Sequence, residues 1–411
     1  MSSLSIIGLG KLGSCMAVSF AWAGFDVIGV DINKDFVDKI NKGIAPVQEP
    51  LLQDFLTKYK KKIHATTDIS EAMQKTDVSF LIVPTPSNKD DRFSTEYLER
   101  VLGEMSSYLK HKEYHLFVIT STIMPTDTEK KLMPIIKSKN VGFCYSPEFI
   151  ALGSVITDFI NPDFILIGES DKKAGDILEG IYKKVCLNAS IKRMSIVSAE
   201  IAKISLNSFI TMKISFANQL MNICQEIPNA DIDDITNAMG CDRRISPHYL
   251  KGGLAYGGPC FPRDNRAFIK FANDYNSGAT LAKETDWINY LQHVKLAEFI
   301  LKHTTEKDFI CILGVSYKPD TPVIEESPSL AVKDILSKNR KVTLIYDVDL
   351  SAFESAVKTC NTFVFMVNDE RYWRITKYFK DRKVTVVDTW RRMINKKWPE
   401  NVRYLPYGRY C

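Results

Sequence analysis

Residues 4–13 read LSIIGLGKLG, an apolar run that passes directly into a glycine-rich turn. The pattern predicts a strand at 4–7, a turn, a helix to about residue 23 and a second strand at 27–30. This order of elements is a βαβ unit. Further buried strands are predicted, with stretches long enough for crossover helices between them, at 78–83, 116–120 and 164–167. Such alternation predicts a parallel sheet covered by helices on both faces.

The second half of the chain first becomes helical and then returns to an α/β pattern. Residues 198–227 form one long amphipathic segment without proline or glycine, with Ser198 as the predicted N-cap of a connecting helix. Helical character continues to about residue 304, and strands are then predicted at 309–313, 342–346, 363–367 and 384–387. We therefore divide the chain into residues 1–197, 198–304 and 305–411.

The composition is that of a soluble globular protein and is compatible with an acidic small ligand. Of 411 residues, 45% are hydrophobic and 25% charged, and the net charge is only +5. Because basic residues are interspersed with acids, neither a nucleic acid nor a membrane is expected as a partner. The nine cysteines show no metal-ligand spacing, so we expect reduced thiols, no metal site and a cytoplasmic location.

The glycine-rich turn predicts a dinucleotide site. Gly8, Gly10 and Gly13 form G-x-G-x-x-G between a strand and a helix, where backbone N–H groups can bind a pyrophosphate. Asp31 ends the second predicted strand, and a carboxylate there can accept hydrogen bonds from the ribose hydroxyls of NAD. It would repel the extra phosphate of NADP, although Asn33 and Lys34 lie nearby. The alternative is a turn needed only for helix packing.

A second candidate site surrounds Cys260, in the sequence GGPCFPRD at residues 257–264. A thiol beside a cation, with N–H groups freed by glycines, can ionise and attack a carbonyl carbon. An isolated cysteine is more often a buried, inert thiol. We interpret most of the other seven cysteines before Cys411 in that way.

Several motifs together resemble the UDP-glucose/GDP-mannose dehydrogenase family. YLKGGLAYGGPCFPRD at 249–264 closely resembles its catalytic-cysteine signature, and other family motifs follow in the right order: STIMPT from Ser121, SPEF ending at Phe149, AEIAKISLNSF from Ala199, LGVSYKPDT from Leu313 and ESPSL from Glu326. The resemblance covers essentially the whole chain. It implies an α/β protein with an N-terminal Rossmann domain, a central helical dimerisation domain with a long connecting helix, and a C-terminal Rossmann-like domain.

The resemblance also implies a reaction and its residues. The reaction is a four-electron, NAD-dependent oxidation of a nucleotide sugar, with UDP-glucose to UDP-glucuronate favoured, through a thiohemiacetal and a thioester on Cys260. The implied catalytic residues are Cys260, Lys203, Asn207, Asp264, Glu148 and Thr122. The implied cofactor residues are Gly8, Gly10, Lys11, Leu12, Gly13, Asp31, Thr85, Thr122, Glu148 and Arg263. The implied substrate residues are Lys203, Asn207, Arg244, Tyr249, Gly257 and Lys318, and Arg244 would come from the partner subunit of a homodimer.

The sequence departs from the family pattern at a few positions and leaves alternatives open. The departures are Ala151 and Leu152 in place of Arg-Glu, Ala255 for glycine, Pro259 for serine, Arg263 for lysine and Glu325 for arginine. GDP-mannose or another UDP-hexose is the alternative substrate. A two-electron dehydrogenase of the 3-hydroxyacid type would not use Cys260, and a catalytically inactive NAD-binding homologue would keep only the fold.

Overall fold

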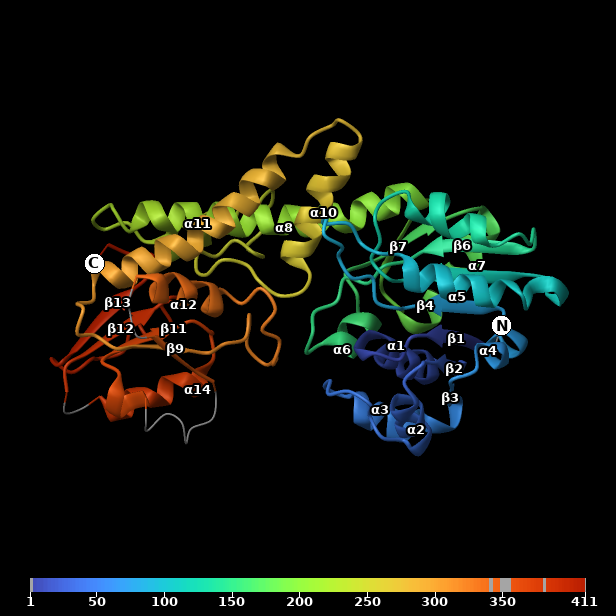
Figure 1. Ribbon diagram of the computed structural model, residues 1–411, viewed down its shortest axis with the longest axis horizontal. Coiled ribbons are helices and arrows are strands. Elements are labelled where there is room, and N and C mark those ends of the chain that lie inside the picture. Colours follow the sequence, from blue (N-terminus) through green and yellow to red (C-terminus); the bar gives the residue numbers. More distant parts are fainter. Residues whose placement is uncertain (1–2, 340–342, 348–355, 380–381, 411) are drawn as a thin grey trace. The chain divides into compact units, whose positions relative to one another are not determined.

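The computed structural model describes residues 3–339, 343–347, 356–379 and 382–410. The chain forms two compact units, Met1–Ile204 and Ser205–Cys411 (Figure 1). One helix, α8 (Ile196–Cys224), contributes its first turns to unit 1 and the rest to unit 2. Among the described residues, no helix has both the length and the apolar composition needed to cross a bilayer.

Unit 1 is an eight-stranded sheet in the order β3-β2-β1-β4-β5-β6-β7-β8. Its strands are β1 (Ser3–Ile7), β2 (Asp26–Val30), β3 (Ile63–Thr66), β4 (Val78–Leu81), β5 (His115–Ile119), β6 (Val141–Tyr145), β7 (Phe164–Glu169) and β8 (Ser190–Ser195). Its other helices are α1 (Lys11–Trp22), α2 (Lys34–Lys42), α3 (Leu52–Tyr59), α4 (Ile69–Lys75), α5 (Glu96–Ser106), α6 (Val155–Ile160) and α7 (Lys172–Val185). Single turns of 3-10 or π helix lie at Lys60–Lys62, Leu109–His111, Thr128–Leu132 and Met133–Ile135.

The expectation of a wholly parallel sheet in unit 1 is wrong at one junction. Strand β7 pairs with β6 in the antiparallel direction, with Cys144 opposite Glu169, and β8 then runs parallel to β7. The connection from β6 to β7 contains only the short helix α6 before the chain turns back into the sheet. The other strand pairs of unit 1 are parallel.

Helices cover both faces of this sheet. One hydrophobic cluster joins the strands to α1, α2, α3, α6 and α7, and a second joins them to α4, α5 and the first turn of α8 (Figure 1). Helix α8 begins at Ile196, two residues before the predicted cap. The side chain that accepts from the backbone N–H of Ser198, at 3.3 Å, is Ser195 Oγ. Ser198 therefore lies inside the helix.

Unit 2 is built on a five-stranded parallel sheet in the order β10-β9-β11-β12-β13. Its strands are β9 (Ile310–Leu313), β10 (Thr343–Tyr346), β11 (Thr362–Phe365), β12 (Val384–Asp388) and β13 (Val402–Pro406). Its helices, besides the rest of α8, are α9 (Ile232–Gly240), α10 (Phe261–Asp274), α11 (Thr280–Lys302), α12 (Pro328–Lys338) and α14 (Glu370–Trp373), with a 3-10 turn at Arg374–Tyr378. Val342, the first residue of one predicted strand, lies outside the described residues.

The core of unit 2 also lies on both faces of its sheet. One cluster packs α8, α9, α11 and α12 against the strands, and the other packs α14 and neighbouring segments against the opposite face. The predicted fold class is therefore confirmed: an N-terminal Rossmann-type region, a helical middle and a C-terminal Rossmann-like sheet. The division at residues 197/198 and 304/305 stays a prediction.

Candidate active site

The glycine turn of unit 1 is shaped by close packing at two of its three glycines. Gly8 has φ +102°, and a Cβ there would lie 2.3 Å from the carbonyl oxygen of Ile82. A Cβ on Gly13 would lie 1.9 Å from the carbonyl oxygen of Gly8. At Gly10, by contrast, a Cβ would have no described heavy atom within 4 Å. The turn thus leaves open space where the N–H groups at the start of α1 can meet a phosphate.

Asp31 lies beside this turn, at the end of β2. Its Oδ2 accepts a 2.6 Å hydrogen bond from the N–H of Leu9, and its Oδ1 accepts a 2.8 Å bond from the N–H of Asn33. Each oxygen keeps a lone pair, and the side chain is only half-buried, so ribose hydroxyls can also bind. Asn33 caps α2 by accepting from the N–H of Asp35. The open turn and this oriented carboxylate fit a dinucleotide without a 2′-phosphate.

Lys11 and Leu12, the two other predicted cofactor residues of the turn, contact neighbouring side chains of unit 1. Lys11 Nζ lies 3.8 Å from Glu49 Oε2, while Glu49 Oε1 accepts from the N–H groups of Gly153 and Val155. This pair ties the first turn of α1 to the segment that follows the departures at residues 151 and 152. Leu12 is partly buried against the hydrophobic cluster around α1.

Thr85 and Thr122 meet at the carboxyl ends of two adjacent strands. Thr85 Oγ1 donates a 2.7 Å hydrogen bond to the carbonyl oxygen of Thr122. The two residues follow β4 and β5, which are neighbours in the parallel part of the sheet. The edge of a sheet at which parallel strands end is where α/β folds bind ligands.

Glu148 and Lys203 are also together in unit 1. Lys203 Nζ donates a 2.6 Å hydrogen bond to the backbone carbonyl of Glu148, and lies 4.4 Å from the ring centroid of Phe149. The Tyr182 hydroxyl donates to Glu148 Oε1 at 3.3 Å. Burial raises the pKa of Glu148 to about 7, while the Tyr182 hydrogen bond and the charge of Lys203 oppose that rise. A carboxyl group with this pKa can exchange a proton near neutral pH.

Glu200 is a second buried carboxylate in unit 1, and it was not among the residues predicted for the site. Its oxygens accept hydrogen bonds from the N–H groups of Thr126 at 2.6 Å and Thr128 at 3.1 Å. Thr126 has φ +79°, a left-handed conformation that is strained for a β-branched residue. Glu200, one turn before Lys203, therefore holds the strained end of the segment that carries Thr122.

In unit 2, Cys260 stands at the N-cap of α10, a 14-residue helix. Its side chain is exposed, and its carbonyl accepts from the N–H of Asp264 at 2.8 Å. A helix N-terminus favours negative charge, so this position favours the thiolate. The exposed position leaves the thiol accessible, and its predicted reactivity and catalytic role stay predictions.

Asn207 and Asp264 form a buried pair behind Cys260. Asn207 Nδ2 donates a 2.6 Å hydrogen bond to Asp264 Oδ2, and the two residues are 9% and 1% exposed. Arg263 Nε contacts Asp264 Oδ1 at 3.3 Å. The predicted carboxylate, amide and guanidinium are therefore adjacent in unit 2, and the amide fixes the orientation of the carboxylate.

The glycines before Cys260 pack against the segment that contains Lys318. Gly258 has φ +84°, and a Cβ there would lie 2.6 Å from the ring of Tyr317. A Cβ on Gly257 would lie 2.2 Å from the carbonyl oxygen of Glu326. Lys318 Nζ lies 5.8 Å from the ring centroid of Tyr317. Gly257 and Lys318, both predicted to bind substrate, thus belong to neighbouring segments.

The two remaining predicted substrate residues are exposed. Tyr249 is 52% exposed, and its ring meets Phe261 edge-on with centroids 6.1 Å apart. The Arg244 side chain is 81% exposed and pairs with Asp242 of its own chain at 2.6 Å. Neither residue is part of the buried network around Asp264.

The other described cysteines match the prediction that most are inert. Six are buried, and only Cys241 is exposed besides Cys260: Cys15, Cys144, Cys186, Cys224, Cys311 and Cys360 are the buried ones. Burial raises the pKa of Cys15 to about 12 and that of Cys186 to about 12. Such thiols are not nucleophiles at neutral pH.

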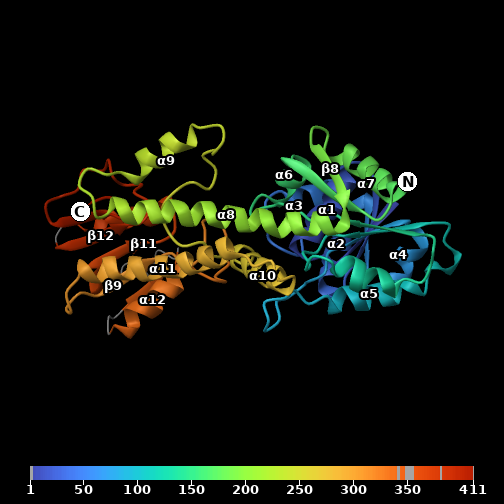
Figure 2. The same cartoon turned by 90° about the horizontal axis from the view of Figure 1, so that it is seen from above.

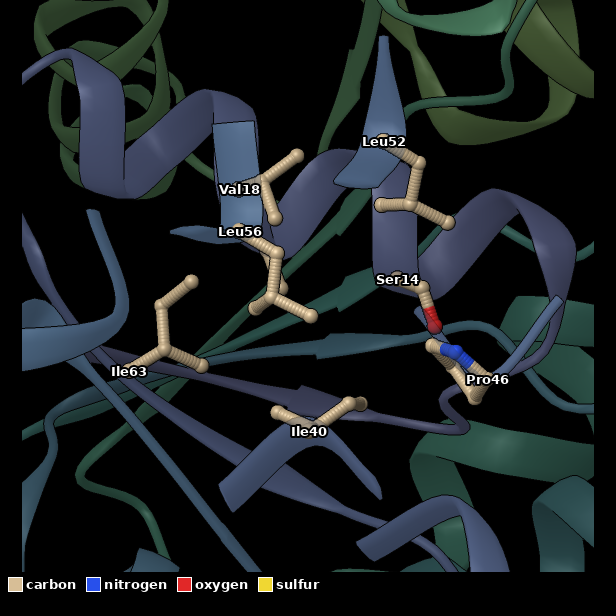
Figure 3. A pocket seen from close by; sticks show the side chains of 8 residues that line it. Ser14, Val18, Ile40, Pro46, Leu52, Leu56 and Ile63 are labelled. Atoms are coloured by element: carbon tan, nitrogen blue, oxygen red, sulfur yellow. The ribbon is translucent and has the colours of Figure 1, made fainter. Parts of the chain in front are cut away.

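A small hollow in unit 1 does not belong to this chemistry. Figure 3 shows side chains from α1, α2, α3 and β3 facing one another here, with Val18, Ile40, Leu56 and Ile63 among the lining residues. The one polar side chain in the lining, Ser14, already donates to the carbonyl oxygen of Leu9 at 2.6 Å. The hollow is a gap in the apolar packing behind the glycine turn.

Two family models match the chain. Residues 2–186 match the NAD binding domain of the UDP-glucose/GDP-mannose dehydrogenase family, and residues 197–290 match its central domain. A GDP-mannose 6-dehydrogenase of Pseudomonas syringae pv. tomato is 32% identical over 367 residues, which are 86% of this chain and 81% of that protein. This chain belongs to the UDP-glucose/GDP-mannose dehydrogenase family.

Other members show the same breadth of similarity. A UDP-glucose 6-dehydrogenase of Bacillus subtilis is 31% identical over 345 residues, 82% of this chain and 77% of that protein. The solved structure of a UDP-glucose dehydrogenase from Pyrobaculum islandicum superposes with a TM-score of 0.86 at 26% identity, covering 100% of this chain and 98% of that one. The chain is therefore an NAD-dependent nucleotide-sugar dehydrogenase, and its cofactor is NAD.

Proposed function

We propose that this dehydrogenase oxidises UDP-glucose to UDP-glucuronate and that Cys260 carries the sugar through the second half of the reaction. The observation that supports this most is the placement of Cys260, exposed at the start of α10, with the buried Asn207–Asp264 pair directly behind it. A thiolate at a helix N-terminus is both available and activated.

When bound, NAD would act as the hydride acceptor. Oxidation of an alcohol to a carboxylate releases two hydrides and therefore needs two molecules of NAD. The sugar alcohol first loses its hydroxyl proton and a hydride from its carbon, which leaves an aldehyde. The Cys260 sulfur then adds to the aldehyde carbon, so that a C–S bond forms and the C=O double bond becomes single, and the oxygen takes a proton to give a thiohemiacetal. Loss of that proton and of a hydride from carbon leaves a thioester. Water then attacks the thioester carbon, the C–S bond breaks, and the thiolate and the carboxylate are released.

The other predicted catalytic residues suit the charges that this sequence creates. Lys203 and Asn207 are four residues apart on α8 and so share one helix face, where an ammonium and an amide can stabilise an oxyanion. Glu148, with its pKa raised to about 7, can take a proton from the attacking water. Thr122 and Asp264 would orient that water or the general base.

The geometry of the glycine turn and of Asp31 supports an assignment of these groups to parts of NAD. The N–H groups after Gly10 would hold the pyrophosphate, and Asp31 would hold the adenosine ribose. The hydrogen-bonded pair Thr85 and Thr122 would line the end of the site nearer the sheet edge.

UDP-glucose is the proposed substrate, and GDP-mannose is the alternative. The sequence YGGPCFPRD from Tyr256 and the similarity to the Pyrobaculum enzyme support a UDP-sugar. The G-x-A-x-x-G pattern from Gly253 and a GDP-mannose relative at 32% identity support the alternative. NADH formation with a panel of UDP- and GDP-sugars decides between them: a kcat/KM highest for a GDP-sugar would overturn the substrate assignment.

We further propose a homodimer in which Arg244 completes the partner's site. Phe209, Phe216 and Ile223 recur every seven residues on α8 and are 57%, 45% and 54% exposed. On α11, the stacked pair Trp287 and Tyr290 is also half-exposed. Exposed apolar side chains in such number typify a protein interface.

The buried thiols suit a reducing compartment, and we propose the cytoplasm as the location.

The role of Cys260 is tested with Cys260→Ala and Cys260→Ser. Both variants should bind NAD like the wild type. Neither should sustain turnover, and in Cys260→Ser this is because the serine oxygen is a poorer nucleophile than the thiolate. Cys260→Ser can nevertheless retain some first-step chemistry. Unimpaired steady-state activity in Cys260→Ala would favour a two-electron dehydrogenase instead. No NADH from any sugar of the panel with wild-type protein would favour an inactive homologue.

A further inference from the structure

The segment directly before Cys260 is an irregular loop that is nevertheless buried. Residues 252–258 lie outside helices and strands, yet each of them is buried. Its glycines allow this close packing: a Cβ on Gly253, for instance, would lie 2.6 Å from the ring of Trp390. A buried loop must find hydrogen-bond partners for its peptide groups, because water cannot serve them.

Three buried amide side chains provide those partners. We call them the amide clasp: Asn218 on α8, and Asn289 and Gln292 on α11. Their exposed fractions are 1%, 9% and 2%. Because an amide carries a donor and an acceptor at fixed positions, it can bind a peptide group on both sides at once.

The contacts of the clasp use both ends of each asparagine. Asn289 Oδ1 accepts from the N–H of Tyr256 at 2.7 Å, and its Nδ2 donates to the carbonyl of the same residue at 3.0 Å. Asn218 Oδ1 accepts from the N–H of Gly253 at 2.8 Å, and its Nδ2 donates to the carbonyl of Leu254 at 3.0 Å.

Gln292 completes the clasp and links its two helices. Its Nε2 donates to the carbonyl of Gly253 at 2.8 Å, and its Oε1 accepts from Asn222 Nδ2 at 3.1 Å. About two turns earlier on each helix, Ser215 Oγ donates to the carbonyl of Thr285 at 3.4 Å. In unit 2, α8 and α11 therefore run side by side, as Figure 2 shows, and both helices hold the loop.

We propose that the amide clasp positions Cys260: it fixes the backbone of residues 253–256, and through Gly257 and Gly258 it sets the place of the thiol at the start of α10. The proposal rests on the proposed function, since it assigns positioning residues to the nucleophile of that reaction. The N–H of Gly258 also donates to the carbonyl of Glu325 at 3.0 Å, so the loop is anchored at both ends of this stretch. A thiol displaced by about 1 Å would lose about a hundredfold in rate.

The test replaces the donor of one clasp residue and leaves its shape. In Asn289→Asp, an ionised carboxylate can still accept the hydrogen bond from the N–H of Tyr256. It has no proton to donate to the Tyr256 carbonyl, so that second hydrogen bond is lost. A protonated carboxyl group restores the donor. Asn218→Asp makes the same change at Leu254 and serves if the first variant does not fold. The control is Asn401→Asp, because Asn401 Nδ2 bridges the carbonyls of Phe379 and Arg382, remote from the loop in sequence.

Two readouts separate positioning from simple loss of stability. The first is kcat and KM for the nucleotide sugar from pH 6 to 8, each relative to wild type at the same pH. The second is the rate of iodoacetamide labelling of Cys260 relative to Cys241, the other exposed thiol among the described cysteines, by peptide mass spectrometry.

At pH 8, Asn289→Asp should lower kcat about a hundredfold, change KM less, and lower the Cys260 to Cys241 labelling ratio. Both effects should diminish toward pH 6 as the new carboxyl group is protonated. Asn401→Asp should lower the melting temperature without changing the labelling ratio. The proposal is overturned if both clasp variants fold with wild-type kcat and labelling ratio at pH 8. Failure of the proposed function is a separate result, because Cys260→Ala would then remain active.

Discussion

The hydroxyl of Tyr182 should set the pH at which the enzyme becomes active. It donates to Glu148 Oε1 at 3.3 Å and so stabilises the ionised form of a carboxyl group whose pKa burial has raised to about 7. Tyr182→Phe removes this donor and leaves the ring in place. Ser146, the other partner of the hydroxyl, keeps its 3.0 Å hydrogen bond to the carbonyl of Leu166. The substitution therefore acts mainly on Glu148.

The size of the effect follows from the hydrogen bond. Bonds to charged groups contribute about 1.5–3 kcal/mol, and the length of this one places it at the low end, so its loss should raise the pKa of Glu148 by about one unit. The acid limb of kcat should move from about 7 to about 8. At pH 7 the ionised fraction would fall from about one half to about one tenth, and kcat about fivefold.

The assay is kcat against pH from NADH absorbance at saturating NAD and nucleotide sugar, in a range where the hydrolytic step limits turnover. The plateau above pH 9 should be shared by variant and wild type, since Glu148 is ionised in both. Tyr114→Phe is the matched control, because the Tyr114 hydroxyl is buried against Gly142 and has no hydrogen-bond partner among the described residues. An acid limb unmoved in Tyr182→Phe, or moved equally in Tyr114→Phe, would refute the role of Glu148 as the base.

Three further predictions concern the cofactor, the proposed dimer and the loop before Cys260. Asp31 should make kcat/KM for NAD at least about a hundredfold higher than for NADP, because a carboxylate facing a phosphate costs several kcal/mol; comparable activity with NADP would contradict this. Arg244→Ala and Cys260→Ala subunits, each inactive alone, should regain activity when allowed to exchange, and mixed dimers without activity would exclude an Arg244 in trans. Gly258→Ala should cost about 1–2 kcal/mol of stability for its left-handed backbone and should lower kcat by displacing the ring of Tyr317; wild-type kcat in the folded variant would show that this contact is dispensable.

Much of the fold could be predicted because its central strands are apolar and lie next to glycine turns. In unit 1, β1, β2, β4, β5 and β7 were predicted from their apolar runs. Strands β3, β6, β8 and β13 were missed. Strand β8, for example, reads SIKRMS and is only partly buried, so it has no apolar run to recognise. The antiparallel pairing of β7 could not be predicted either, since hydrophobic pattern identifies a strand and leaves its direction open.

The site divides in the same way between local and distant information. Residues within motifs, such as Cys260 and Asp264, were found because several informative residues lie close together in sequence. Asn289 and Gln292 were missed, because they lie about 30 residues after the loop they hold, in an otherwise ordinary helix. Glu200 was missed as well, because its partners, the N–H groups of residues 126 and 128, lie more than 70 residues earlier. Such contacts come from tertiary packing and leave no local pattern.

The central claim is that one thiol retains the sugar while two hydrides leave it. The most direct measurement is the number of NADH molecules formed per nucleotide sugar when the sugar is limiting and NAD is in excess. The four-electron reaction on Cys260 predicts two NADH per sugar and a uronic acid as the product. One NADH per sugar, with an aldehyde or ketone as the product, would contradict it.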